Sequence, residues 1–372
     1  MTEPLYIGLM SGTSADGVEA ALVAINDGHI QLRHACYDRF DAVLHDDIHG
    51  LARGDYEGRD PIDALGMLDV RLGEAFAAAA LRVLTESGIE PRAVRAIGSH
   101  GQTIRHRPDG PAPFTLQIGD PNIIAARTGI TTAADFRRRD IALGGQGAPL
   151  APAFHQATFA APDQIRALLN LGGIANITVL EPGRDVRGFD TGPANTLLDA
   201  WAARHDRGRI DEDGAWASSG SIHNELLQAL LKDDYFRRPP PKSSGPEHFN
   251  LGWLQAGITS LPEPPTPEDV QATLVELSAM TVADALLAQA VRQVYVCGGG
   301  VHNPVLMAAL RRALPSVAVH STAELGIDPD YVEAMAFAWL AHRTVTGQAG
   351  NLPAVTGART PAVLGTICPG VS

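Results

Sequence analysis

A glycine-rich segment near the N-terminus has the composition of a turn that could hold a phosphate group. The segment Ser11-Gly12-Thr13-Ser14-Ala15-Asp16-Gly17 follows an apolar run over residues 5–10. It matches the first half of the phosphate-binding loop GxxxxGK[ST], but Val18-Glu19 stand where Lys and Ser or Thr are required. What remains is a turn whose backbone N–H groups could surround a phosphate, with Asp16 facing its metal ion; a plain β-turn is the alternative.

Asp190 is the first candidate for a general base. It lies in Phe189-Asp190-Thr191-Gly192, at the end of an apolar segment over residues 186–190. An aspartate with an ordinary pKa of about 4 is ionised at neutral pH, so it can accept a proton without a large pKa shift. An aspartate at a strand end is more often a helix N-cap, and residues 194–201 have a helical pattern, so that alternative remains open here.

Two further glycine turns follow apolar segments. Gly172-Gly173 occupies a turn like the first one, so the two turns could clamp phosphates from both sides. Gly298-Gly299-Gly300 follows residues 294–297 but lacks the GxGxxG pattern and the later acidic residue of a Rossmann site. These glycines would let the backbone approach a nucleotide base or ribose; close packing of a helix and a strand is the alternative.

Arginine-rich and polar segments offer substrate contacts. Residues 135–140 carry three arginines flanked by Asp135 and Asp140, just before the glycine loop 144–149, and could bind a carboxylate or a developing phosphate charge. A solvated charged face is the alternative. Ser99 and His100, with Gln102 nearby, follow a short apolar segment and suit sugar hydroxyls, although a lone histidine is more often structural. No HExxH motif or cysteine pair is present, so no protein-bound metal is predicted.

The elements that must position these residues occur in the same order twice. Three apolar segments over residues 5–10, 18–25 and 30–37 predict a strand meander, followed by a helix over 63–89 and a strand over 94–97. Beyond residue 165 a second series repeats this order with strands over 166–171, 174–180, 186–190 and 294–297 and a helix over 270–291. The duplication predicts an α/β fold of two lobes whose glycine turns face a cleft.

Composition restricts the class of protein. The 372 residues contain 29 Lys and Arg against 42 Asp and Glu, and the net charge of −13 has the wrong sign for a nucleic-acid or anionic-membrane surface. The three cysteines, Cys36, Cys297 and Cys368, are far apart and unpaired, which favours a reducing cytoplasm. No apolar run approaches the roughly 18 residues that span a bilayer, so a cytoplasmic protein without membrane or nucleic-acid partners is expected.

Seven blocks of residues together resemble the anhydro-N-acetylmuramic acid kinase family. The resemblance runs almost end to end, because it also includes residues 333–338 and 351–358. The blocks are Gly8-Leu9-Met10-Ser11-Gly12-Thr13-Ser14-x-Asp16-Gly17, Gly98-Ser99-His100-Gly101-Gln102-Thr103, Asp135-Phe136-Arg137, Gly144-Gly145-Gln146-Gly147-Ala148-Pro149, Asn170-x-Gly172-Gly173, Gly188-Phe189-Asp190-Thr191-Gly192-Pro193 and Cys297-Gly298-Gly299-Gly300.

The resemblance implies an actin-like and sugar-kinase-like fold, with two ribonuclease-H-like lobes around an ATP cleft. We expect residues 1–128 and 345–372 in the first lobe and 129–344 in the second. The implied reaction uses ATP and water to convert 1,6-anhydro-N-acetylmuramate into N-acetylmuramate 6-phosphate, a step of peptidoglycan recycling. Family members tend to be homodimers, so a homodimer is expected.

The resemblance also implies roles for individual residues. Asp190 would activate the water that attacks C1 while O6 takes the γ-phosphoryl group, and Mg²⁺ would accompany ATP. Glu333 would help to hold the sugar. Further candidates for substrate contacts are Ser99, His100, Asp135 and one of the arginines 137 to 139, for which Arg139 is chosen. The implied nucleotide-binding residues are Gly12, Thr13, Ser14, Ala15, Asp16, Gly17, Val18, Glu19, Gly172, Gly192, Gly298, Gly299 and Gly300.

The chain departs from the family pattern at four positions. Glu19 replaces an aspartate and Ala194 a glycine, while Ser244 and Pro246 replace Thr and Arg after Lys242. The added methyl of Ala194 would loosen nucleotide binding, and the role of the loop near residue 246 is left open. Two alternative functions are a simple sugar kinase of the same fold, without ring opening, and an actin-like ATPase that acts as a conformational switch.

Overall fold

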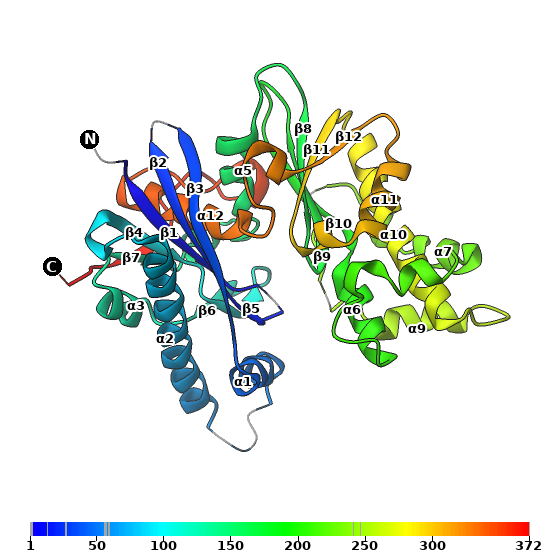
Figure 1. Cartoon of the computed structure of the whole chain (residues 1–372), viewed down its shortest axis with the longest axis horizontal. Coiled ribbons are helices and arrows are strands. Elements are labelled where there is room, and N and C mark those ends of the chain that lie inside the picture. The colour runs from blue at the N-terminus through cyan, green and yellow to red at the C-terminus, as the bar shows by residue number, and fades with distance from the viewer. Residues whose placement is uncertain are drawn as a thin grey trace. The chain divides into compact units, whose positions relative to one another are not determined.

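The computed structural model describes residues 3–12, 14–26, 28–55, 58, 60–240, 242–245 and 247–371. Two positions singled out from the sequence, Thr13 and Pro246, lie outside these residues. The chain divides into two compact units, and each unit combines a sheet with helices (Figure 1). Unit 1 comprises Met1–Thr158 and Tyr331–Ser372, and unit 2 comprises Phe159–Asp330.

Unit 1 contains a sheet of six strands in the order β13-β7-β4-β1-β2-β3. The first three strands form the antiparallel meander that the sequence predicted, and β4 and β7 then continue the sheet in parallel to β1. β13 pairs antiparallel with β7 at the edge. The bounds are β1 Leu5–Met10, β2 Gly17–Asn26, β3 His29–Arg39, β4 Val94–Ser99, β7 Thr132–Ala134 and β13 Thr366–Cys368.

The helices of unit 1 bury apolar stripes against this sheet. The predicted helix 63–89 is α2, which begins after the N-cap Asp60 and ends at Gly88, whose φ of 69° suits a glycine. A separate hairpin pairs β5 Gln102–Arg107 with β6 Phe114–Ile118. The helices are α1 Ala42–Arg53, α2 Pro61–Ser87, η1 Pro91–Ala93, α3 Pro121–Thr128, α4 Arg138–Ala142, α5 Ala151–Phe159, α12 Val332–Val345 and α13 Pro353–Thr356.

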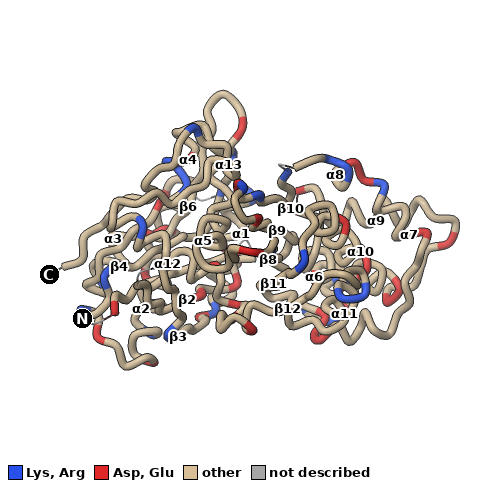
Figure 2. Tube along the Cα trace, turned by 90° about the horizontal axis from the view of Figure 1, so that it is seen from above, with Lys and Arg blue, Asp and Glu red and all other residues tan. Residues whose placement is uncertain are grey.

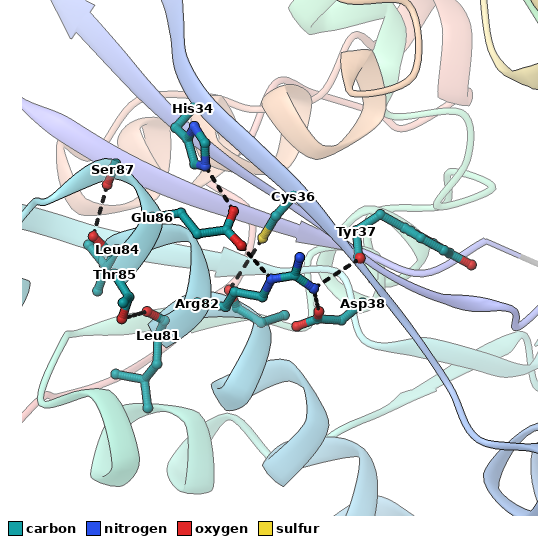
Figure 3. Close-up of polar contacts among 11 residues, drawn as sticks. His34, Cys36, Tyr37, Asp38, Leu81, Arg82, Leu84, Thr85, Glu86 and Ser87 are labelled. Carbon is teal, nitrogen blue, oxygen red and sulfur yellow. Dashed lines mark hydrogen bonds and ion pairs between the residues drawn. The ribbon is translucent and has the colours of Figure 1, made fainter.

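Polar contacts join α2 to the outer strand β3 (Figure 3). The Arg82 Nε donates to Glu86 Oε1 at 2.7 Å, and its Nη1 pairs with the Asp38 carboxylate. His34 Nε2 lies 3.0 Å from Glu86 Oε2, which extends the network along β3. Because these side chains are largely exposed, the ion pairs add little to stability.

Unit 2 contains a second sheet, of five strands in the order β10-β9-β8-β11-β12. Its strands are β8 Arg166–Leu171, β9 Ile174–Leu180, β10 Arg187–Pro193, β11 Gln293–Cys297 and β12 Ala318–Ser321. The α-helices are α6 Asn195–Arg204, α7 Asn224–Leu231, α8 Asp234–Arg237, α9 Leu251–Thr259, α10 Pro267–Leu287 and α11 Pro304–Ala313. Short 3-10 helices are η2 Glu212–Gly214, η3 Ala217–Ser219, η4 Gly299–His302 and η5 Thr322–Leu325.

α10 is the central helix of unit 2. Among the described residues, it is the helix whose length and apolar composition would be enough to cross a membrane. However, 72% of its apolar window is buried inside the structure, where Leu274, Leu277 and Val282 join the core. A hydrophobic helix packed on most sides is typical of a globular core.

The two sheets have the same topology. When the strands of each sheet are numbered in chain order, both sheets have the spatial order third, second, first, fourth, fifth. This order is β3-β2-β1-β4-β7 in unit 1, where β13 is added at the edge beside β7, and β10-β9-β8-β11-β12 in unit 2. In both, the first three strands are antiparallel neighbours and the fourth is parallel to the first. The predicted duplication and the α/β class with two ribonuclease-H-like lobes are therefore confirmed.

The unit boundaries differ from those expected. The first lobe was expected to comprise residues 1–128 and 345–372, whereas unit 1 also contains residues 129–158 and 331–344. β7 is a strand of the first sheet, and α12 packs against β1, β2 and β4. Because α12 is buried over almost its whole length, its apolar residues need that sheet as a partner.

α12 lies directly against the backbone of the sheet at two glycines. A Cβ atom at Gly8 of β1 would overlap the carbonyl oxygen of Ala334, and one at Gly98 of β4 would overlap that of Phe337. The helix can approach this closely only because both strand positions lack a side chain.

We predict that Gly8→Ala destabilises unit 1 by about 1–3 kcal/mol, because the new methyl group must push α12 away from β1. Denaturant unfolding followed by circular dichroism measures the effect. Gly66→Ala is the matched control, since nothing lies within 4 Å of its Cβ position and alanine favours a helix interior. Equal unfolding midpoints for the two variants would contradict the close contact.

Candidate active site

Asp190 lies on β10, at the edge of the second sheet. The register of β10 against β9 shifts between Asp190 and Gly192, so a β-bulge redirects the backbone at this carboxylate. The N-cap position of α6 is Ala194, without a side-chain hydrogen bond, so Asp190 is not the cap of that helix. The alternative explanation for this aspartate is therefore wrong.

Three hydrogen bonds fix Asp190 to the segment that follows α7. The main-chain N–H of Ser244 donates to Asp190 Oδ2 at 2.9 Å, and the Asp190 N–H donates to the carbonyl of Lys242 at 3.0 Å. The hydroxyl of Tyr235 donates to the main-chain carbonyl of Asp190 at 2.9 Å. Both the backbone and the carboxylate of the candidate base are thus held in place.

The surroundings of Asp190 bring its pKa close to neutrality. Burial raises the pKa from 3.8 to about 6, the hydrogen bond from Ser244 opposes this rise, the charge of Glu247 adds to it and that of Lys242 lowers it. A carboxyl group with a pKa near the working pH can both take up and release a proton efficiently. From the sequence, a general base needed no pKa shift, and a carboxyl group with a pKa of about 6 is still mostly ionised at neutral pH.

The glycines near Asp190 have mainly packing roles. A Cβ atom at Gly192 would lie 2.9 Å from Phe236 Cε1, and one at Gly173 would meet Thr196 Oγ1. The carbonyls of Gly172 and Gly173 accept hydrogen bonds from Asn195 and Ala194 at 3.1 and 3.0 Å. This turn between β8 and β9 consequently packs onto the start of α6. At Gly172 a Cβ atom would fit, because the nearest atom, the carbonyl oxygen of Ile174, would be 3.7 Å away.

Gly298–Gly300 joins β11 to the 3-10 helix η4. Gly298 has φ of 81°, and a Cβ atom there or at Gly300 would collide with Asn170 or Leu171. Nothing lies within 4 Å of a Cβ at Gly299. The packing explanation thus accounts for Gly298 and Gly300. Beside η4 lies a cavity of about 610 Å³, lined by Val301, His302, Ser321, Ala323, Asp328, Pro329 and Asp330.

The turn between β1 and β2 in unit 1 is held from two sides. Ala15 has φ of 52° and its N–H donates to the carbonyl of Gly12 at 3.1 Å. Gln102 of β5 accepts from the Ser11 hydroxyl at 2.7 Å and donates to the Gly12 carbonyl at 3.1 Å. On the other side His49 Nε2 lies 3.0 Å from the Ser14 carbonyl.

The same turn leaves part of its surface open. Gly12 and Ser14 are exposed and Asp16 is partly exposed, whereas Ala15 and Val18 are buried. A Cβ atom at Gly17 would meet the backbone of Asp38, so that glycine has a packing role between β2 and β3. Glu19 is partly buried on β2. From the sequence, Gln102 was expected near the sugar hydroxyls, but in the structure its side-chain amide forms hydrogen bonds with Ser11 and Gly12 of this turn.

A buried cluster in unit 1 joins three of the chemistry-bearing positions. Arg137 donates through Nε and Nη2 to Nε2 of His100 at 3.1 and 2.9 Å, and through Nη1 to the carbonyl of Gly147 at 2.8 Å. Glu333, in the first turn of α12, interacts electrostatically with Arg137. The Phe337 ring lies 4.7 Å from that of His100.

Burial sets the charge states in this cluster. Burial and the charge of Arg137 hold the pKa of His100 well below 6.5, so its Nε2 can accept from the guanidinium. Burial raises the pKa of Glu333, which the charge of Arg137 partly opposes. Burial lowers the pKa of Arg137 to about 10, against the charges of Glu333 and Asp140. At neutral pH Arg137 remains a cation.

Three other predicted substrate residues lie around this cluster. The hydroxyl of Ser99, at the end of β4, is buried and has no hydrogen-bond partner among the described residues. Asp135, with φ of 57°, pairs with Arg138 at 3.5 Å. Arg139 is exposed on α4, which Figure 2 shows as a basic segment, so Arg137 rather than Arg139 is the arginine beside His100.

The sequence made Arg137 one of three arginine candidates without showing which of them lies beside His100, and it did not indicate Ser244 and Gln102 as partners of the base and of the turn. Ser244 and Asp190 are 54 positions apart, and only the fold brings them together. Arg137 and Gln102 lie in blocks that carry the family resemblance, and for Ser244 the signal was the Lys242 loop, where the chain departs from the resemblance pattern.

The topology and the site define a class of protein. Two α/β units of the same ribonuclease-H-like topology, each with a glycine turn between its first two strands, are the architecture of the actin-like and sugar-kinase-like ATPases. A model of the anhydro-N-acetylmuramic acid kinase family matches residues 4–370. The chain belongs to the anhydro-N-acetylmuramic acid kinase family, and it is a kinase that uses ATP.

Relatives that carry this enzyme name match along almost the whole chain. The anhydro-N-acetylmuramic acid kinase of Xylella fastidiosa is 54% identical over 98% of this chain and 96% of its own. That of Xanthomonas axonopodis pv. citri is 55% identical over 98% of both chains. Among solved structures, a glucokinase from Streptomyces griseus, in complex with glucose and AMPPNP, is 13% identical over 91% of this chain and 99% of its own, with a TM-score of 0.41.

We predict that kcat/KM falls about tenfold per pH unit below pH 6, because Asp190 must be ionised to accept a proton and its pKa is about 6. Initial rates measured from pH 4.5 to 8.5 test this. Binding of a non-hydrolysable ATP analogue over the same range is the control, since it reports nucleotide affinity without the base. An activity that stays level down to pH 4.5 would contradict the shifted pKa.

We predict that Gln102→Leu raises the KM for ATP about tenfold and changes the KM for the sugar less. The substitution removes the acceptor of the buried Ser11 hydroxyl and one of the two donors to the Gly12 carbonyl, which keeps its bond from the Ala15 N–H, at a cost of about 1–3 kcal/mol. Gln117→Leu is the matched control, because that amide bonds within the same β5–β6 hairpin, to Thr103 and Thr115. Equal KM values for ATP in the two variants would show that Gln102 does not support ATP binding through the turn.

Proposed function

We propose that this kinase opens the anhydro ring and phosphorylates O6 in one reaction, turning 1,6-anhydro-N-acetylmuramate, ATP and water into N-acetylmuramate 6-phosphate and ADP. The observation that carries the proposal is the Asp190 carboxylate, oriented by Ser244 and with a pKa of about 6. The family membership and the names of the relatives supply the substrate. The product belongs to peptidoglycan recycling.

The bond changes balance as follows. Asp190 takes a proton from a water molecule whose oxygen forms a bond to C1 of the sugar. The C1–O6 bond breaks, and its electron pair goes to O6, which forms the new bond to the γ-phosphorus as ADP leaves. Asp190 then releases its proton to solvent. Because the transition state of phosphoryl transfer is loose and highly charged, positioning and charge stabilisation do most of the remaining work.

The turn Gly12–Glu19 is the proposed site for the ATP phosphates. Hydrogen bonds from Gln102 to the Gly12 carbonyl and between His49 and the Ser14 carbonyl hold the described part of this turn, and Gly12 and Ser14 face solvent. Oriented backbone N–H groups suit a phosphate chain. In unit 2, Gly172, Gly192 and Gly298–Gly300 would shape the nucleotide site, with Gly299 offering the open backbone and the 610 Å³ cavity beside η4 offering space.

Mg²⁺ would be held mainly by the phosphates of ATP. The described residues contain no group of three or more His, Cys, Asp or Glu side chains that could form a metal site. One carboxylate, that of Asp16 in the turn, fits an ion that keeps several water ligands and binds through substrate phosphates. When bound, the ion would neutralise charge on the phosphate oxygens.

The buried cluster of unit 1 is the proposed sugar-binding region. Glu333 and His100 would hold the sugar, with Ser99, Asp135 and the arginines at 137 to 139 contributing; of these arginines we favour Arg137 over Arg139 because of its contact with His100. We further propose that the enzyme acts in the cytoplasm as a homodimer and has neither nucleic-acid nor membrane partners, in keeping with its net charge of −13.

We predict that the reaction run in H₂¹⁸O places one heavy oxygen at the anomeric carbon and none in the phosphate ester, because water attacks C1 while O6 stays with the sugar. Mass spectrometry of the product and its fragments measures the label. A simple sugar kinase that leaves the ring closed would give a product without label, and sugar-independent ATP hydrolysis without a phosphorylated sugar would indicate an ATPase switch.

Asp190→Asn is the matched variant for this experiment, since it keeps the shape of the side chain and removes its basicity. We expect it to lower kcat at least about 100-fold. Retention of full activity would remove Asp190 from the mechanism while leaving the labelled product to be explained by another base.

A further inference from the structure

The segment Lys242–Ser244 covers the free edge of the second sheet next to Asp190, the proposed general base. β10 is the edge strand of that sheet, so one side of its backbone has no neighbouring strand. The Asp190 N–H donates to the Lys242 carbonyl at 3.0 Å, and the Ser244 N–H donates to Asp190 Oδ2 at 2.9 Å. The segment therefore pairs with the backbone of Asp190 and with its side chain at the same time.

Side-chain contacts anchor this segment close to Asp190. The Lys242 ammonium donates to the carbonyls of Tyr235 and Phe236 at 3.1 and 3.3 Å and lies 4.7 Å from the centre of the Tyr235 ring. Tyr235 in turn donates its hydroxyl to the Asp190 carbonyl. Lys242, Tyr235 and Asp190 thus form a closed set of contacts that fixes where the Ser244 N–H points.

We propose that Ser244 is a positioning residue for the reaction: its main-chain N–H holds one oxygen of the Asp190 carboxylate and leaves the other directed at the attacking water. The inference rests on the proposed function, because it assigns a partner to the base used there. A carboxylate that can rotate freely would spend less time in the orientation that proton transfer needs, so the hydrogen bond raises kcat.

The same hydrogen bond stabilises the ionised form of the base. The charged and titratable groups that face Asp190 are Lys242, Glu247 and Tyr235. Lys242 favours the carboxylate and Glu247 opposes it, while the Tyr235 hydroxyl bonds to the main chain. Loss of the Ser244 donor alone therefore makes the carboxyl group harder to ionise.

The test variant is Ser244→Pro, which removes the main-chain donor. We expect the acidic midpoint of the kcat profile to move up by about one pH unit and kcat at pH 7 to fall about tenfold or more. The KM for ATP should stay within about twofold. Ser244→Ala keeps the N–H, so its acidic midpoint should equal that of the wild type.

A proline control and an independent variant complete the design. Ser243→Pro puts the same ring on the neighbouring exposed residue and leaves the Ser244 N–H in place, so its midpoint should not move. If Ser244→Pro fails to fold by circular dichroism, Lys242→Arg replaces it, because this change keeps the positive charge near Asp190 but alters the contacts of the ammonium group with Tyr235 and Phe236, and it should move the midpoint in the same direction. The titration of ¹³C-labelled aspartate carboxyls, assigned with Asp190→Asn, reads the same pKa without turnover.

The outcomes separate the two proposals. A folded Ser244→Pro enzyme with wild-type midpoint and kcat overturns the inference, as does an equal midpoint shift in Ser243→Pro. The proposed function fails on different grounds, namely when the wild-type enzyme gives no ¹⁸O-labelled phosphosugar.

Discussion

The close contact of α12 with the first sheet is the constraint on which unit 1 depends. Gly8 and Gly98 carry no side chain, so the helix lies against the backbone of β1 and β4. The contact fixes the first half of α12, whose first turn carries Glu333. It also brings Phe337 against the His100 ring. A partly buried acid, a partly buried cation and a buried neutral imidazole can coexist there because each one has a fixed neighbour.

In unit 2 a balance of opposing effects defines the base. Desolvation raises the pKa of Asp190, while a main-chain N–H and a lysine resist that rise, and the result lies near 6. The balance follows from the position of the residue on an edge strand with a bulge, where a distant segment can pair with it. Near-neutral basicity suits a step that takes a proton from water and later returns it.

Much of the fold was predictable because its signals are local. Apolar runs separated by glycine turns predicted the strands of both meanders, and the apolar spacing over residues 63–89 predicted α2. The boundaries were less predictable, since α12 follows unit 2 in the chain but packs in unit 1. Neighbouring arginines also diverge: Arg137 is turned inward to His100, whereas Arg139 is exposed, and sequence order cannot distinguish them.

By itself, the sequence determined the class of fold, the family blocks, the turn at residues 12–17 and the identity of Asp190 as an acid at the end of a strand. These features depend on residue type and on spacing along a few turns or strands. Only the tertiary structure decided that Gly298 and Gly300 serve packing, that Gln102 holds a turn and that Ser244 holds the base. Desolvation and hydrogen bonding depend on neighbours from distant parts of the chain, so no local pattern encodes them.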